Sequence, residues 1–174
     1  MNQGNLLAER LSPKAESLLA KGNAYINTKH RIRMVWVYHY ANIHNLMVVG
    51  AANRTELMTG TFTQWGCDQC ADVMPIIHLY RSQVELLAEI LHIPERVRNK
   101  PADPDVIPGL GDKGELLGSF YTADQILWGL EKGIPLDSLN QQFGEMEVSR
   151  INNLVEGSKF MRESPTTFEV INFF

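Results

Sequence analysis

The sequence lacks most of the features that would place it in a specialised class of protein. Its 174 residues include only two cysteines, too few for a disulfide framework. No apolar run approaches the length of a membrane-spanning helix, and the first residues lack the basic and then apolar pattern of an export signal. A net charge of −4 offers no basic surface to nucleic acid or anionic lipid. We therefore expect a cytoplasmic protein that binds neither nucleic acid nor membrane.

Several catalytic signatures are absent or incomplete. There is no G-x-S-x-G elbow, Walker A loop or H-E-x-x-H helix. Residues 109–114 match G-x-G-x-x-G, but the proline-rich stretch before them cannot form the central strand that this motif needs. Cys67 and Cys70 have CxxC spacing, yet no second cysteine pair completes a structural zinc site, so two free thiols are expected. The histidines show no metal spacing, and His39 is expected in the core.

The composition that is present, 44% hydrophobic and 21% charged, is typical of one globular domain spanning residues 1–174. A weak helix is expected at 5–20, ended by Gly22-Asn23. A helix at 28–45 is apolar nearly all round, so the core or a second subunit must cover it. Residues 98–120, rich in proline and glycine, predict a lid loop. Further helices are predicted at 80–92, at 123–132 behind a capping box at Thr122 and Gln125, and at 145–160.

Two short apolar runs, Leu46–Gly50 and Asp72–Ile77, predict strands that alternate with these helices. This order is typical of an α/β fold with a doubly wound parallel sheet. The first strand leads directly into a polar turn and Glu56. One interpretation is that this carboxylate reaches a hard cation or polar ligand at the strand end. The alternative is an ordinary strand-to-helix connection with a solvated glutamate.

Taken in order, short segments of the chain resemble the C-terminal half of ammonia-dependent NAD+ synthetases, in the ATP-pyrophosphatase (adenine nucleotide alpha-hydrolase-like) superfamily. The resemblance covers about residues 23–168. It rests on residues 27–34, 46–56, the segment TGTFTQWG at 59–66, 71–72, 79–84, 93–95, 108–109, 112–118, Tyr121, 158–159, Pro165 and Phe168.

The resemblance implies a ligase chemistry. ATP would adenylate the carboxylate of deamido-NAD, and ammonia would then attack the acyl-adenylate, with Mg2+ neutralising the phosphates. It also implies a homodimer through the helix that carries Arg31, and ammonia supplied free or by a glutaminase. The implied deamido-NAD contacts are Arg31, Gln64, Asp72, Ser158 and Lys159; the ATP contacts are Ala51, Arg81 and Asp103; the metal ligand is Glu56.

The chain departs from the family pattern at several of these positions. It has Ala51 for threonine, Gln64 and Arg81 for lysine, Asp103 for serine or threonine, and Ser158 for histidine, while Cys67–Cys70 replaces a glycine-rich loop. The family's phosphate-binding loop, Ser-Gly-Gly-x-Asp-Ser, does not occur in this sequence. The expected fold is therefore a partial Rossmann-like, doubly wound parallel sheet that lacks its phosphate-loop half, with a helix-rich C-terminal part.

These observations lead to one main hypothesis and two alternatives. The main hypothesis is an NAD+ synthetase-like chain that is incomplete and inactive alone, as a C-terminal fragment, as one half of a split gene that needs a separate N-terminal half, or as a truncated paralogue. The first alternative is a non-catalytic, dimer-forming or regulatory paralogue. The second is an ATP-dependent adenylating enzyme with a different acceptor.

Overall fold

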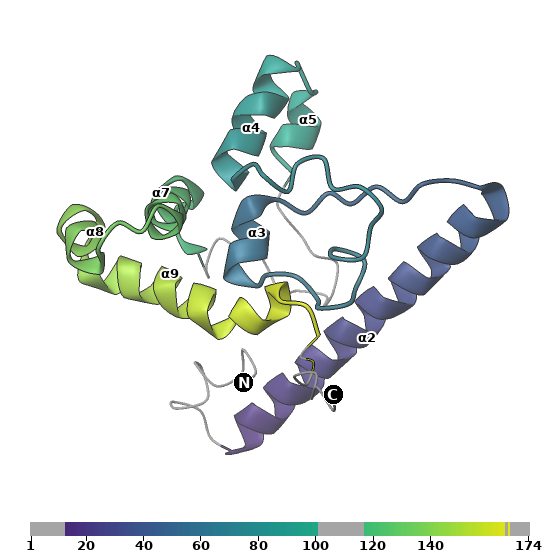
Figure 1. Ribbon diagram of the computed structural model, residues 1–174, viewed down its shortest axis with the longest axis horizontal. Coiled ribbons are helices and arrows are strands. Elements are labelled where there is room, and N and C mark those ends of the chain that lie inside the picture. The colour runs from purple at the N-terminus through teal and green to yellow at the C-terminus, as the bar shows by residue number, and fades with distance from the viewer. Residues whose placement is uncertain (1–12, 101–116, 166, 168–174) are drawn as a thin grey trace, which may run out of the picture.

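The computed structural model describes the main chain of residues 13–100, 117–165 and 167, with side chains from residue 22 onward. In Figure 1 the long helix α2 lies along one side, and the shorter helices gather on the other. None of the helices in these ranges is long and apolar enough to cross a membrane. The helices are α2 (Pro13–His44), α3 (Arg54–Thr59), α4 (Arg81–Ile90), α5 (Glu95–Arg98), α7 (Phe120–Glu131), α8 (Leu136–Phe143) and α9 (Glu145–Gly157), followed by the 3-10 helix η1 (Lys159–Arg162).

Helix α2 is longer than the sequence predicted. It runs without interruption through Gly22-Asn23, so the predicted break there is wrong. Glycine in a helix interior costs only about 1 kcal/mol, which the 32-residue helix tolerates. The helix ends before Asn45, whose φ of 52° lies in the left-handed region. Asparagine is one of the few residues other than glycine that adopt this conformation readily.

The two predicted strands are reduced to one parallel bridge between Val49 and Val73. The Gly50 amide donates to the Val73 carbonyl at 2.8 Å, and the Asp72 amide donates to the Val48 carbonyl at 3.0 Å. Both bridge residues have exposed side chains. Two strands without neighbours do not form a stable sheet, so the described part of the chain is helix-rich. The predicted parallel pairing is present only as this bridge.

The core lies among α7, α8 and α9 and includes Met58 of α3 and Tyr80. Helix α8 comes close to α7 at Gly129, where an added Cβ would lie 2.7 Å from Leu139 Cδ2. Helices α5 and α8 were not predicted from the sequence. Helix α7 begins at Phe120 with Ser119 as its N-cap, whose hydroxyl accepts from the Thr122 amide at 3.4 Å. The predicted cap at Thr122 is therefore three residues too late.

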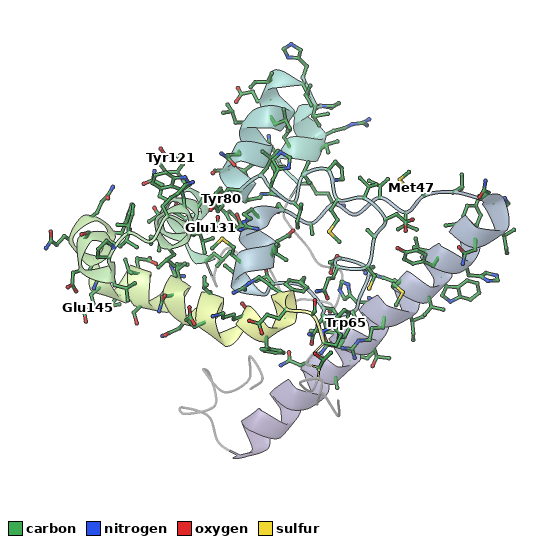
Figure 2. All side chains as sticks on the ribbon, in the orientation of Figure 1. Met47, Trp65, Tyr80, Tyr121, Glu131 and Glu145 are labelled. Atoms are coloured by element: carbon green, nitrogen blue, oxygen red, sulfur yellow. The ribbon has the colours of Figure 1, made fainter. Side chains whose placement is uncertain are left out.

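A buried carboxylate joins three of these helices. Asp124 of α7 accepts from the Thr55 hydroxyl of α3 at 2.6 Å and from the Ser82 amide of α4 at 2.7 Å. The Thr55 hydroxyl also accepts from the Arg81 amide at 2.8 Å. In a second link, the Tyr80 hydroxyl donates to Glu131 of α7; both residues are labelled in Figure 2. Helices α3, α4 and α7 therefore form one unit held by polar contacts as well as by the core.

Replacing Asp124 by alanine should lower the free energy of unfolding by about 2–4 kcal/mol, because it leaves the Thr55 hydroxyl and the Ser82 amide without their acceptor. Urea denaturation followed by circular dichroism would measure the loss. Tyr121→Ala, at an exposed position on the same helix, is the matched control and should change the value by less than about 0.5 kcal/mol. Equal effects of the two substitutions would contradict the role of Asp124.

Candidate functional site

Glu56 lies in the first turn of α3 and forms a capping box with Asn53. The Glu56 amide donates to Asn53 Oδ1 at 3.0 Å, and the Asn53 amide donates to Glu56 Oε2 at 3.2 Å. This reciprocal pair fixes the start of the helix and holds the carboxylate at the helix N-terminus. The polar turn after the first predicted strand is thus an ordered helix start that presents Glu56 at a defined place.

A pocket brings Glu56 and Arg81 together. It is lined by Asn53, Thr55, Glu56, Thr61, Arg81, Leu117 and Phe120. The Arg81 guanidinium lies over the Phe120 ring, 5.7 Å from its centroid, and Nε donates to Glu85 at 3.0 Å. The predicted ATP contact Ala51 is exposed and is not part of this lining. Asp103 lies outside the described residues, as do the motif at 109–114 and most of the predicted lid.

Three of the predicted deamido-NAD contacts take part in the packing of other segments against α2. Arg31 donates through Nε and Nη2 to the Gln64 carbonyl, at 3.3 and 3.0 Å. The Gln64 side chain donates to the Phe160 carbonyl at 3.4 Å, so it reaches the segment that contains the exposed Lys159. Asp72 accepts from the Val48 amide at 2.8 Å and from the Tyr38 hydroxyl at 3.3 Å. These contacts attach the segments 61–72 and 46–50 to α2.

Ser158 lies in a different environment. Its side chain is fully buried, and its hydroxyl is 2.7 Å from the Leu154 carbonyl and 3.1 Å from the Met58 carbonyl. Arg162 donates to the same hydroxyl at 2.8 Å and to the Met58 carbonyl at 2.6 Å. Burial lowers the pKa of Arg162 from its usual value. Ser158 therefore ties the end of α9 to α3, while its neighbour Lys159 faces solvent.

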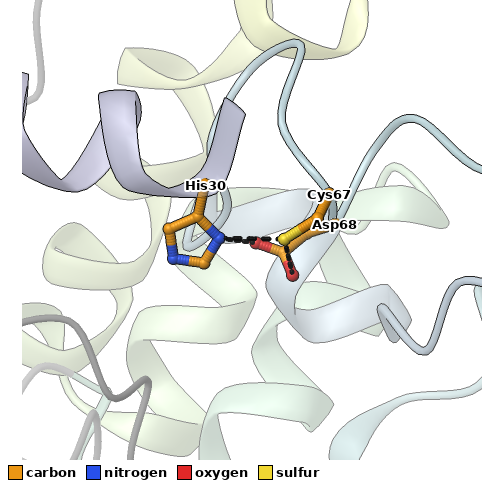
Figure 3. A group of neighbouring side chains, drawn as sticks. All are labelled: His30, Cys67 and Asp68. Carbon is orange, nitrogen blue, oxygen red and sulfur yellow. Dashed lines mark hydrogen bonds and ion pairs between the residues drawn. The ribbon is translucent and has the colours of Figure 1, made fainter. Parts of the chain in front are cut away.

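A further cluster was not predicted from the sequence. His30 Nδ1 lies 3.1 Å from Cys67 Sγ and 3.2 Å from Asp68 Oδ2, as Figure 3 shows. His30 and Cys67 are 37 positions apart, so no local spacing could have indicated the contact. His39, which was expected in the core, is exposed instead. That expectation was wrong because its side of α2 is uncovered.

Burial, followed by the Asp68 carboxylate, raises the pKa of the Cys67 thiol to about 11. A thiol with this pKa is protonated near neutral pH and is a poor nucleophile. Neither cysteine forms a disulfide. Cys67 therefore lacks the lowered pKa that the attacking cysteine of a redox CxxC motif requires.

Comparison with known proteins identifies close relatives. The NAD synthase family matches residues 6–165. The NH(3)-dependent NAD(+) synthetase of Coprothermobacter proteolyticus is 40% identical over 145 residues, which cover 83% of this chain and 49% of that protein. The chain thus spans about half the length of this curated relative.

Two solved structures are also similar. The NMN synthetase of Francisella tularensis aligns with a TM-score of 0.66 at 25% identity, over 91% of this chain and 64% of that one. The NH3-dependent NAD synthetase of Campylobacter jejuni, solved with a nitrate ion, aligns with a TM-score of 0.66 at 26% identity. That alignment covers 82% of this chain and 54% of the Campylobacter chain.

Introducing histidine at position 158 should destabilise the chain by about 2–4 kcal/mol, because the larger ring overfills a fully buried site and removes the hydroxyl. The free energy of unfolding, measured by denaturant titration, tests this. Lys159→His places the same side chain on the exposed neighbour and should change the value by less than about 0.5 kcal/mol. A Ser158→His variant as stable as the original chain would show that the position can open to accept a larger side chain.

Proposed function

The chain belongs to the NAD synthase family, and we propose that it contributes about half of an ATP-dependent ligase that amidates deamido-NAD. In this proposal ATP adenylates the nicotinate carboxylate, and ammonia displaces AMP from the acyl-adenylate. The observation that carries the proposal is the pocket shared by Glu56 and Arg81. A carboxylate and a guanidinium that line one pocket can together bind a metal–phosphate complex, the carboxylate through the metal and the guanidinium through a phosphate.

The residues of this pocket fit one edge of a magnesium site. Magnesium is held in proteins by one or two carboxylates together with substrate phosphates, and Glu56 would supply one such carboxylate. When bound, the ion would neutralise phosphate charge and favour departure of pyrophosphate. Arg81 would bind a phosphate through its planar guanidinium, which Phe120 and Glu85 orient.

The acyl substrate would lie toward α2. Arg31 and Asp72 are oriented there by contacts with Gln64 and Tyr38, and Lys159 lies exposed beyond Phe160. In the proposed function Arg31 and Lys159 face anionic groups of deamido-NAD, and Asp72 accepts from a hydroxyl or amine. A partial Rossmann-like sheet, completed by a separate N-terminal half that adds strands beside the Val49–Val73 bridge, would join the two regions.

A second candidate keeps the adenylation step and changes the acceptor. One support is the burial of Ser158, because a buried side chain cannot contact a ligand. The other is the similarity to an NMN synthetase. In this case the substrate would be a mononucleotide that carries a carboxylate where NMN carries its amide, and it would take the place of the larger deamido-NAD. Comparing the two carboxylates in one assay distinguishes the candidates.

The chain alone should form no NAD, whereas mixing it with the unmatched part of the Coprothermobacter relative should restore ATP–pyrophosphate exchange that depends on deamido-NAD. In the mixture Glu56→Gln should lower exchange by about 100-fold, since a removed charge-stabilising group typically costs 2.7–4 kcal/mol. Glu89→Gln, an exposed acid on α4, is the control and should leave the rate unchanged. Turnover by the chain alone, or an unaffected Glu56→Gln mixture, would disprove the proposal as stated.

The apolar side of α2 supports a homodimer. Trp36 is 67% exposed, Tyr40 60% and Ile43 64%, and exposed apolar surface of this extent is typical of an interface. Size-exclusion chromatography with light scattering should give a mass of two chains, and the double substitution Val35→Glu and Trp36→Glu should give one. Trp128→Glu, on the exposed side of α7, should leave the dimer intact. A monomer at micromolar concentration before substitution would contradict this interface.

A further inference from the structure

We propose that His30, Cys67 and Asp68 bind one zinc ion, with water as the fourth ligand. This inference is independent of the proposed ligase function, because it involves neither Glu56 nor Arg81 and requires neither ATP nor deamido-NAD. It rests on the geometry of the cluster, on the chemistry of its three ligand atoms and on its position between α2 and the segment that follows α3.

The three side chains already approach the arrangement of a tetrahedral site. His30 Nδ1 is 3.1 Å from Cys67 Sγ and 3.2 Å from Asp68 Oδ2, and Cys67 Sγ is 3.7 Å from Asp68 Oδ1. Zinc bonds of about 2.0 Å to nitrogen or oxygen and 2.3 Å to sulfur place neighbouring ligand atoms roughly 3.3–3.7 Å apart. One ligand atom from each residue lies within 4.8 Å of the other two. Because His30 contacts Oδ2 and Cys67 contacts Oδ1 of Asp68, the carboxylate would turn to place one oxygen on the ion.

The ligand types favour zinc over magnesium. Imidazole nitrogen and thiolate sulfur are common zinc ligands, whereas magnesium is held by oxygen atoms. On binding, the ion would displace the thiol proton of Cys67 to solvent. The resulting thiolate and the Asp68 carboxylate together balance the two charges of the ion, which favours binding in a half-buried place. In the metal-free cluster, one His30 nitrogen faces both the sulfur and the carboxylate. Atoms of all three ligand types therefore already converge on one place.

The main chain around the cluster is suited to hold the ligands in place. His30 is 9% exposed and belongs to helix α2. Cys67 and Asp68 belong to a tight turn in which the Gln69 and Cys70 amides both donate to the Gly66 carbonyl, at 3.1 and 2.9 Å. A metal bound here would join α2 to this turn. It would do so beside the Arg31–Gln64 contact, and so would fix the orientation of Arg31.

The test is a metal titration of the purified chain after reduction and treatment with a chelator. Zinc chloride should bind with a stoichiometry of one ion per chain and should raise the melting temperature, because it binds the folded state. Magnesium chloride at the same concentration should produce no shift. Failure to bind zinc in competition with a micromolar-affinity chromophoric chelator would overturn the proposal.

Single substitutions identify the ligands. Cys67→Ser and His30→Ala should each weaken zinc binding by at least about 100-fold, since each removes a direct ligand. Asp68→Asn should weaken it by about 10-fold. Cys70→Ser is the matched control on the same turn and should retain one zinc with affinity within about threefold of the original chain. Loss of binding in Cys70→Ser, or unchanged binding in Cys67→Ser, would overturn the assignment.

Cobalt substitution provides a readout that does not depend on stability. Cobalt in place of zinc should give the thiolate-to-cobalt charge-transfer band in the original chain and in Cys70→Ser, and no such band in Cys67→Ser. Circular dichroism of each variant without metal would show whether its helices are intact. A charge-transfer band that persists in Cys67→Ser would place the ion elsewhere and reject the cluster as the site.

Discussion

The carboxylate of Asp124 is the contact on which the arrangement of the pocket depends. Its two oxygens accept from Thr55 of α3 and from the Ser82 amide of α4. Glu56 follows Thr55 in sequence and Arg81 precedes Ser82, so one buried acceptor sets the separation of the two side chains that line the pocket. Hydrogen bonds to an ionised acceptor are stronger than bonds between neutral groups. Helix α7, which carries Asp124, therefore positions both α3 and α4.

Helix α2 is held in a different way. Its contacts with the segments 46–50 and 61–72 are polar, and they run from Arg31 to the Gln64 carbonyl, from Tyr38 to Asp72 and from His30 to the turn at Cys67. Many of its apolar side chains point to solvent. An element with few buried apolar contacts and exposed hydrogen bonds opens at low cost in free energy. The position of Arg31 therefore depends on the contacts that hold this helix, whether with the rest of the chain, with a second subunit or with a bound metal.

What could be predicted from the sequence was mostly local. Short sequence patterns predicted the polar turn after Leu46–Gly50 and the helix that begins at Arg81. The family resemblance assigned Glu56 to the metal and Arg81 to ATP, and so predicted that both lie near the nucleotide. The break at Gly22-Asn23 and the cap at Thr122 were predicted wrongly, because local signals there compete with the continuation of a longer helix. The contact between His30 and Cys67 could not be predicted, since only the folded chain brings these distant positions together.

The positions at which this chain departs from the family pattern lie in different environments, and each environment decides whether the position can still contact a substrate. Arg81 keeps a positive charge and lines the pocket, so the side expected to bind nucleotide retains its main cation. At position 64 the contact to Arg31 uses the main-chain carbonyl, which any residue provides, so this substitution leaves that contact unchanged. Ser158 is enclosed by carbonyls and Arg162 and cannot replace a ligand-facing histidine. Arg81 thus keeps the positive charge expected for adenylation. Ala51 and Asp103 depart from the family pattern on the side expected to bind ATP, and Ser158 departs from it on the side expected to bind the acyl substrate, so the departures affect both substrates.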